Sequence, residues 1–280
     1  MFKQILALVA LPEGTAQAGP DLAVLEGVRT LALAGAEPKA HVHLLHVVEQ
    51  GRGLFDLPSR LRPPPPSLDV AAHALAAEGI QVTALHAQGR LTEEVERIQR
   101  EAKIELVVVG RPSRGWGDHG LRVVRLSDAP VLVMPEGSTL RSGVAVVGMD
   151  FSPNALRAYH LARSFFGEVR PVAVIDAEGE QDDVLALRTR IAAEWAALAG
   201  DDGCAIHITA STRPADALLE ASADADMLAV GSRGLTPLAA VLLGSTAEKL
   251  GARCPCPLLV YRDPGTRRGL FESFLGVREG

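Results

Sequence analysis

The chain has 280 residues, of which 48% are apolar and 4% aromatic, and its formal net charge is −6. This length is typical of about two domains, each able to bury a core. Nucleic acid and anionic lipid attract an excess of lysine and arginine, so the acidic balance argues against both as partners. The apolar N-terminus lacks a basic leader region, and no run approaches the roughly 18 apolar residues of a membrane span. We therefore expect a cytoplasmic protein.

The cysteine and histidine patterns do not indicate a metal or redox centre. Cys204, Cys254 and Cys256 cannot form an all-disulfide framework, and Cys-Pro-Cys is shorter than the CxxC spacing. We expect the three cysteines to be small buried residues or loop residues. A second pattern, HxHxxH at 41–46, would place its first two histidines on one face of a strand and the third on the other, so the three cannot converge without a bend in the strand.

The first half alternates short apolar runs with segments of helical spacing. Leu22, Leu25 and Val28 recur at steps of three, which predicts an amphipathic helix that stops near Gly35. Four consecutive prolines, Pro63 to Pro66, lie in a loop that is expected to be extended and stiff. The predicted strands of this half are 3–9, 42–48, 82–86, 106–109 and 131–134, and the predicted helices are 22–33, 68–78 and 92–103.

The pattern then starts again after a linker at 136–143. The predicted strands are 143–148, 172–175, 205–210, 227–230 and 258–261, and the predicted helices are 154–166, 184–198 and 216–222. The two series match in order and spacing over about 140 residues each, which indicates an internal repeat. Strands alternating with helices predict the α/β class, as two tandem, open, mostly parallel five-stranded sheets with helices on both faces, a Rossmann-like arrangement.

A glycine-rich pattern follows the strand predicted at 227–230. Gly231 and Gly234 enclose two residues, nine residues follow, and Gly244-Ser245 then opens a predicted helix. Amides in a glycine turn and at a helix N-terminus carry partial positive charge, and missing β-carbons let a phosphate approach. Arg233 adds a full charge to the first turn. The pattern therefore suits an anion.

The spacing of these glycines differs from that of two common nucleotide-binding motifs. It fits neither the GxxxxGK[ST] of a P-loop nor GxGxxG, which argues against a flavin- or NAD-binding protein. The pattern also has a purely structural interpretation. In that case Ser245 is the N-cap of a helix and Glu248 completes a capping box, with no ligand involved.

The residues Gly231-Ser232-Arg233-Gly234 with Gly244-Ser245 resemble the ATP-binding motif of the universal stress protein family. The internal repeat is similar to tandem members of that family, whose fold is described as adenine nucleotide α-hydrolase-like. The resemblance covers nearly the whole chain. It implies a degenerate domain at 1–137, an ATP-binding domain at 142–263 and a C-terminal tail at 264–280.

The resemblance also implies which residues bind ATP. Asp150-Phe151-Ser152 is similar to the family's adenine-side signature, in which Asp150 would accept a hydrogen bond from ribose or adenine; a turn-forming aspartate is the alternative. Val174 matches a valine whose backbone contacts the adenine, although a core valine would look the same. The expected ATP-binding residues are Asp150, Val174, Val230, Gly231, Arg233, Gly234, Gly244, Ser245 and Thr246.

The first half lacks these parts. Its first strand runs into residues 8–12, which contain no aspartate, and no Gly-Ser pair follows Gly115 by nine residues, where Val124 and Arg125 occur. Without a second amide cluster, little holds a triphosphate. We expect ATP in the second domain only, with the first domain as a packing partner or interaction surface.

Two functions fit this site. In the first, a nucleotide-dependent regulatory or stress-response protein binds ATP, which orders the loop at 231–244 and changes the surface offered to a regulatory protein partner. In the second, the protein hydrolyses ATP slowly, with Ser245, Thr246 and Asp150 as candidate groups; no His, Glu or Gln stands beside the glycine motif as a base. The sequence favours binding, assigns no catalytic residue, and leaves open whether Mg²⁺ accompanies ATP.

The family commonly dimerises through the edge strand that closes each sheet. The corresponding strands here are 131–134 and 258–261, so the resemblance implies that the two halves pair within one chain as a pseudo-dimer. Such pairing would cover both exposed edges. Whether two chains also form a homodimer is left open.

Overall fold

The structure is a computed structural model that describes residues 2–9, 20–34, 40–48, 66–112, 118–175, 181–199, 204–231 and 245–262. Each half contributes five strands, and the apolar runs of the sequence predicted all ten. The first half has β1 (Gln4–Leu8), β2 (His41–Val48), β3 (Gln81–Gln88), β4 (Leu106–Arg111) and β5 (Val131–Pro135). The second half has β6 (Val144–Gly148), β7 (Glu168–Ile175), β8 (His207–Ala210), β9 (Met227–Gly231) and β10 (Leu258–Tyr261).

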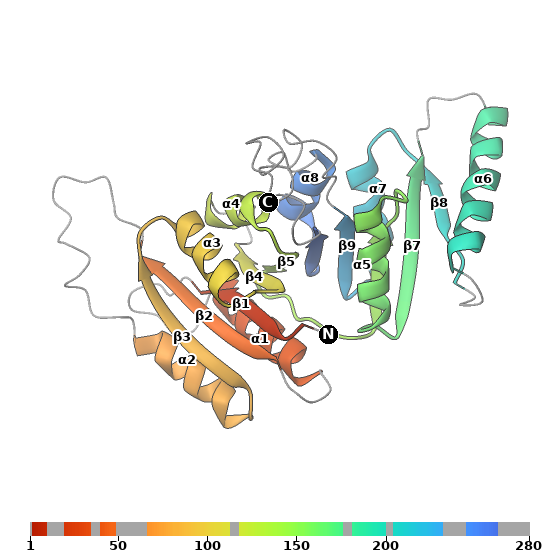
Figure 1. Cartoon of the computed structure of the whole chain (residues 1–280). Helices are drawn as coiled ribbons and strands as arrows, with labels where there is room; N and C mark the ends of the chain where they lie inside the picture. The colour runs from red at the N-terminus through yellow and green to blue at the C-terminus, as the bar shows by residue number, and fades with distance from the viewer. Residues whose placement is uncertain are drawn as a thin grey trace, which may run out of the picture.

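These strands form one ten-stranded sheet in the order β3-β2-β1-β4-β5-β10-β9-β6-β7-β8 (Figure 1). Each half has the same internal order, since β8-β7-β6-β9-β10 repeats β3-β2-β1-β4-β5. Neighbouring strands run parallel within each half. The two five-stranded sheets expected from the sequence are therefore the halves of a single sheet.

The halves meet where β5 and β10 pair antiparallel. Leu259 lies opposite Leu132, and the pairs Leu258–Val133 and Val260–Val131 flank it. The pairing within one chain that the family resemblance implied is confirmed. Both strands would otherwise present a row of unpaired backbone groups, which invites association with other chains.

Helices cover both faces of the sheet. One face carries α1 (Pro20–Leu33), α2 (Pro66–Ala77), α5 (Pro153–Arg163) and α6 (Gln181–Ala199), and the other carries α3 (Leu91–Glu101), α4 (Asp118–Leu126), α7 (Pro214–Ala221) and α8 (Ser245–Arg253). Strand side chains alternate between the layers: Ile5 and Ala7 join the first core cluster, and Leu6 joins the second. Burial on both faces explains why these strands read as continuous apolar runs.

The sequence did not predict α4. It lies after β4, as α8 lies after β9, so each half has a helix at this point. Among the residues of α4 whose burial is described, Gly120, Val123 and Val124 are buried, at the helical spacing i, i+3 and i+4. This signal spans barely one turn, and a glycine inside a helix is unfavourable, which obscures it.

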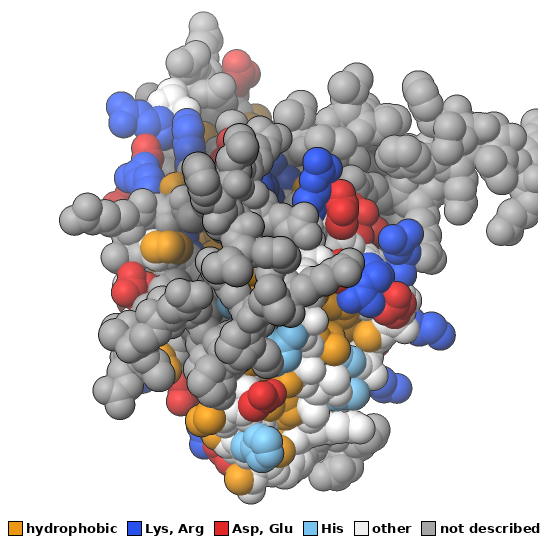
Figure 2. Space-filling model, turned by 90° about the vertical axis from the view of Figure 1, so that its left-hand side faces the viewer, with side chains coloured by type: hydrophobic (Ala, Val, Ile, Leu, Met, Phe, Trp, Pro, Cys, Tyr) orange, Lys and Arg blue, Asp and Glu red, His pale blue; other side chains and the backbone are white. Residues whose placement is uncertain are grey.

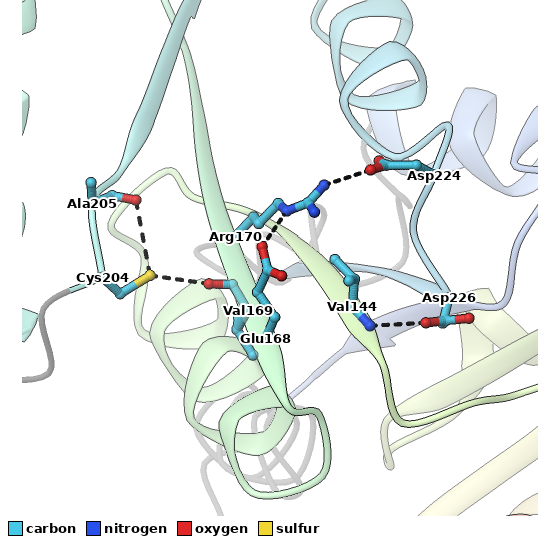
Figure 3. A network of polar contacts seen from close by, with 8 residues as sticks. All are labelled: Val144, Glu168, Val169, Arg170, Cys204, Ala205, Asp224 and Asp226. Atoms are coloured by element: carbon cyan, nitrogen blue, oxygen red, sulfur yellow. Dashed lines mark hydrogen bonds and ion pairs between the residues drawn. The ribbon is translucent and has the colours of Figure 1, made fainter.

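Polar contacts fix the start of the second half's strands (Figure 3). Arg170 on β7 bonds Glu168 at 2.6 Å and reaches Asp224 at 2.8 Å in the turn after α7. Asp226 accepts the backbone N–H of Val144 at 2.9 Å, which ties β6 to the turn before β9. Within the part of the chain that the structure describes, no helix has the length and apolar character needed to cross a membrane.

Candidate functional site

The expected site lies where the strand order of the second half reverses. The chain passes from β6 to β7 on one side, while β9 pairs with β6 on the other. In open α/β sheets, ligands bind at such a switch point, outside the carboxyl ends of the strands. Gly148 at the end of β6 pairs in register with Val230 on β9 and with Val172 on β7. The residues that leave these three strands therefore start side by side.

The turn after β6 is built by Asp150 and Ser152. The Asp150 carboxylate is exposed, and its Oδ1 accepts the backbone N–H of Ser152 at 3.0 Å. Ser152 Oγ in turn accepts the N–H of Ala155 at 3.2 Å and caps α5, which Pro153 begins. Asp150 is thus a turn-forming residue, the alternative that the sequence left open. A carboxylate offers about four acceptor positions, so this bond is compatible with a ligand contact by the same side chain.

Gly231 has a packing role that the sequence did not reveal. A β-carbon there would lie 2.5 Å from the backbone nitrogen of Ala155 and 2.8 Å from the carbonyl carbon of Asn154. The first turn of α5 therefore packs directly against the end of β9, and only glycine leaves room for it. Because those neighbours are backbone atoms, they cannot rotate away. This packing explains the glycine whether or not a phosphate approaches it.

The structure describes some of the other residues expected to bind ATP and not the rest. Val230 on β9 is 6% exposed, and Val174 on β7 is half-buried. Gly148 on β6 pairs with Val172 on β7, and Asp150 and Val174 each lie two residues beyond that pair. Thr246 is half-buried in the first turn of α8, and α8 begins at Ser245 as predicted. Outside the described residues lie Arg233, Gly234 and Gly244, together with the side chain of Ser245.

The matching strand end of the first half carries a buried arginine. β4 continues through Gly110 into Arg111, whose side chain is 6% exposed. Its Nη1 donates to the carbonyl oxygen of Ala252 at 3.1 Å, and its Nη2 donates to that of Cys254 at 2.5 Å. Burial lowers the pKa of Arg111 from its ordinary value. This residue was not predicted from the sequence, although an arginine directly after an apolar strand was the available signal.

Histidines gather near the β2–β3 edge, on the face that Figure 2 shows. The rings of His41 and His43 stack at 4.2 Å, so they share a face as the strand alternation predicted. Their ring nitrogens bond neighbouring strands, His41 to Thr83 Oγ1 and His43 to Gln4 Oε1, each at 2.8 Å. Burial lowers the pKa of both histidines. Among the described residues, no three metal-ligating side chains are grouped to hold a metal ion.

All three cysteines are free thiols, two of them buried. Cys254 and Cys256 place their sulfur atoms 3.5 Å apart just beyond α8. The hydrogen bond between them lowers the pKa of the Cys254 thiol and raises that of Cys256. Cys204 donates to the carbonyl oxygen of Val169 at 3.0 Å.

Fold and site together define an α/β protein with two doubly wound halves, one of which carries a glycine-rich strand end at its switch point. The chain belongs to the universal stress protein family: the family's sequence model matches residues 1–135 and 143–262.

Curated relatives match over short stretches. A universal stress protein of Thermus aquaticus is 42% identical over 52 residues, which cover 18% of this chain and 38% of that protein. A universal stress protein of Mycobacterium tuberculosis is 49% identical over 45 residues, which cover 16% of each chain. The matched segments thus span well under half the length of these relatives.

Solved structures match over nearly the full length. A functionally unknown protein of Pseudomonas aeruginosa PAO1 has a TM-score of 0.67 at 19% identity, covering 99% of this chain and 98% of its own. A universal stress protein of Archaeoglobus fulgidus has a TM-score of 0.62 at 22% identity, covering 93% and 98%. At these identities the similarity establishes the fold alone.

A universal stress protein family protein of Arabidopsis thaliana was solved with AMP bound. It covers 48% of this chain and 90% of its own, at 17% identity and a TM-score of 0.35. This similarity assigns no residue of the present chain.

Proposed function

We propose that this protein is a nucleotide-dependent regulatory protein that binds ATP in its second domain, residues 142–263. Residues 1–137 form a degenerate copy without a nucleotide, and 264–280 form a tail. Membership of the universal stress protein family, one member of which carries AMP, supports an adenine nucleotide as the ligand class.

The observation that carries the proposal is the register at the carboxyl ends of β6, β9 and β7. Gly148 pairs with both Val230 and Val172, so Asp150 and Gly231 leave adjacent strand ends. α8 starts at Ser245, directly after Gly244, the third glycine of the motif. The N-terminus of α8 and the glycine-rich sequence after β9 would suit the phosphates, and the exposed Asp150 carboxylate would suit ribose or adenine.

ATP in the second domain alone is supported by the contrast between the two strand ends. The second half has Gly231 followed by the rest of the glycine motif, whereas the first has Gly110 followed by the buried Arg111. Arg111 donates Nη1 and Nη2 to carbonyl oxygens of the other half, so these two donors are already used within the protein.

Binding rather than rapid hydrolysis follows from the side chains at the edge. Asp150 is an acceptor engaged in a turn, and Thr246 offers a hydroxyl. Phosphoryl transfer needs a group that positions water or removes its proton, and usually a metal ion. Asp150 and Thr246 supply oxygen atoms of the type that Mg²⁺ prefers, but the Asp150 carboxylate already accepts the backbone N–H of Ser152 within its own turn. ATP-dependent ordering would then change the surface offered to a regulatory protein partner.

The direct test is calorimetric titration of the full chain with ATP, with and without Mg²⁺. Gly244→Val should abolish binding, because side-chain atoms would fill the space left for the phosphates. Gly115→Val in the first half is the matched control and should bind ATP as the wild type does. Unchanged affinity of Gly244→Val would refute the site, and a large loss in Gly115→Val would refute the assignment to the second domain.

A turnover measurement separates regulation from catalysis. We expect ATP hydrolysis far below about 1 per second, the low end of ordinary enzymes. Rates above that value would show that the protein is an ATPase.

A further inference from the structure

Helix α8 is held at its C-terminal end by the other half of the molecule. α8 has nine residues, and Arg111 at the end of β4 donates to the carbonyl oxygens of Ala252 and Cys254, where α8 ends. The last carbonyls of a helix have no partner within it and form the negative end of the helix dipole. A guanidinium with two donors therefore caps α8 with both hydrogen bonds and charge.

A second contact joins the first turns of α8 to the first half. Glu248, three residues after Ser245, accepts hydrogen bonds from Arg125 on α4, one of them at 3.1 Å from Nε. A carboxylate near the N-terminus stabilises the helix through its interaction with the helix dipole, but it repels a phosphate bound at the same end. Arg125 offsets that repulsion by neutralising the carboxylate. The pair is partly exposed, at 42% and 35% for the two side chains, so its effect on stability is small.

An arginine of the second half likewise caps a helix of the first half. Arg262, at the end of β10 and 7% exposed, donates to the carbonyl oxygens of Arg125 and Ser127 at 3.1 and 3.3 Å. Each half thus supplies a buried arginine that caps the helix of the other half, α8 by Arg111 and α4 by Arg262. α8 and α4 differ at their N-termini, because only α8 begins at the Gly-Ser pair of the motif.

We propose that Arg111 is a positioning residue for the nucleotide site, through which the half that lacks the motif holds α8 ready to bind phosphate. The proposal rests on the proposed function, because it concerns the same site. It also gives the degenerate half a defined task. Arg111 touches no ligand and acts only through α8.

The physical link between the two ends of α8 is its short length. Nine residues make about two and a half turns, and a helix this short is marginal by itself. Leu250, fully buried, anchors the middle of the helix, while Arg111 fixes the end. If the end frays, the amides at the N-terminus are aligned in only a fraction of molecules. Apparent affinity for a phosphate falls in proportion to that fraction.

The test compares Arg111→Met with Arg262→Met in the full chain. Both variants lose a buried arginine that caps a helix across the interface, so both should lower the unfolding temperature by similar amounts. Arg111→Met should weaken ATP binding about tenfold, as expected when α8 is aligned in about a tenth of molecules. Arg262→Met should stay within about twofold of the wild type, because it releases α4 and affects α8 only through the partly exposed Arg125–Glu248 pair, whose effect is small. Arg111→Lys keeps one charged donor and should recover part of the affinity.

Hydrogen exchange provides a readout without nucleotide. Amides of α8 should exchange faster in Arg111→Met and those of α4 faster in Arg262→Met, because local opening sets exchange. Unchanged α8 exchange in Arg111→Met, or equal losses of ATP affinity in both Met variants, would overturn the inference. A wild type that binds no ATP would instead overturn the proposed function, while the exchange comparison would still decide whether Arg111 holds α8.

Discussion

Asp150 stabilises the turn after β6, and this turn holds the next residue, Phe151, in an unfavourable backbone conformation. Phe151 has a positive φ of 59°, a conformation that is unfavourable for a bulky side chain. The Asp150–Ser152 bond and the Ser152 cap on Ala155 hold the turn in place around it. Strain of this kind persists where the surroundings determine the backbone, often at functional sites. Substituting Asp150 can therefore separate its structural role from the ATP-binding role proposed for it.

Asp150→Asn is expected to weaken ATP binding while leaving the fold intact. The amide oxygen of asparagine can still accept the N–H of Ser152, so unfolding free energy should change by less than about 0.5 kcal/mol. The substitution removes the charge and replaces one acceptor by a donor, which should weaken ATP binding roughly tenfold. Calorimetry and urea unfolding measure the two effects. If Asp150→Asn binds ATP normally and only Asp150→Ala loses stability, the residue forms the turn and does nothing more.

At the level of elements, the contact between β9 and the first turn of α5 sets the shape of the switch point. It is closer than side-chain packing allows, since the missing β-carbon of Gly231 is what admits the backbone of Ala155. Gly148, on the neighbouring strand, is less restricted. A β-carbon there would meet side-chain atoms of Leu218 and Val230 at 3.2 Å, which can move.

A series of alanine substitutions should rank these glycines by stability in the absence of nucleotide. Gly231→Ala should cost about 1–3 kcal/mol, the usual range for overpacking, because backbone atoms block the methyl group. Gly148→Ala should cost less. Gly167→Ala is the control: its nearest atoms lie 3.7 Å away, and its effect should stay within about 0.5 kcal/mol. Urea unfolding gives the ranking, and equal stability of Gly231→Ala and Gly167→Ala would contradict the packing described here.

The strands were predictable because a strand that is buried on both faces has a continuous run of apolar residues. Residues 106–109 are apolar and at most 2% exposed, and the prediction there was correct. β7 shows the limit, since it begins at Glu168 and the sequence indicated 172–175. Pro171 interrupts the strand pattern, because proline cannot donate a hydrogen bond to a neighbouring strand. It is tolerated since β8 pairs only from Val172 onward, so Pro171 has one neighbouring strand.

Other features could not be predicted because they depend on contacts between segments that lie far apart in the sequence. The sequence indicated which strand ends carry the candidate site, but not that α5 presses on Gly231 or that Arg111 reaches Cys254. The latter contact joins residues 143 positions apart, and no local pattern encodes it. The alternative interpretation of Ser245 and Glu248 as a capping box also missed a distant contact, because the Glu248 carboxylate accepts hydrogen bonds from Arg125 of the other half.

On the scale of the whole molecule, the two halves share their cores. Each of the two large core clusters contains residues of both halves, and each continues across the β5–β10 pair. Leu44 on β2 and Trp195 on α6 belong to the same cluster although they come from different halves. Domains joined in this way are expected to unfold as one cooperative unit, whereas weakly coupled domains unfold separately.

A substitution in the first half should therefore destabilise the second. Leu44→Ala removes a fully buried side chain and should cost about 2–5 kcal/mol. Trp195 reports on the second half, since it is 3% exposed, donates to the carbonyl of Cys204 at 2.7 Å and packs edge-to-face on Tyr159. With the other tryptophan, Trp116, replaced by phenylalanine, the Trp195 fluorescence transition in urea should shift together with the circular dichroism of the whole chain.

Leu228→Ala, a fully buried change in β9 of the second half, is the control for that experiment and should shift the same Trp195 transition. If Leu44→Ala instead splits the dichroism into two phases and leaves the Trp195 midpoint in place, the halves unfold independently. The antiparallel pair would then be a contact between two autonomous domains. A single shared transition would mean that the half without the glycine motif helps to stabilise the half that carries it, because the free energy of one sheet is common to both.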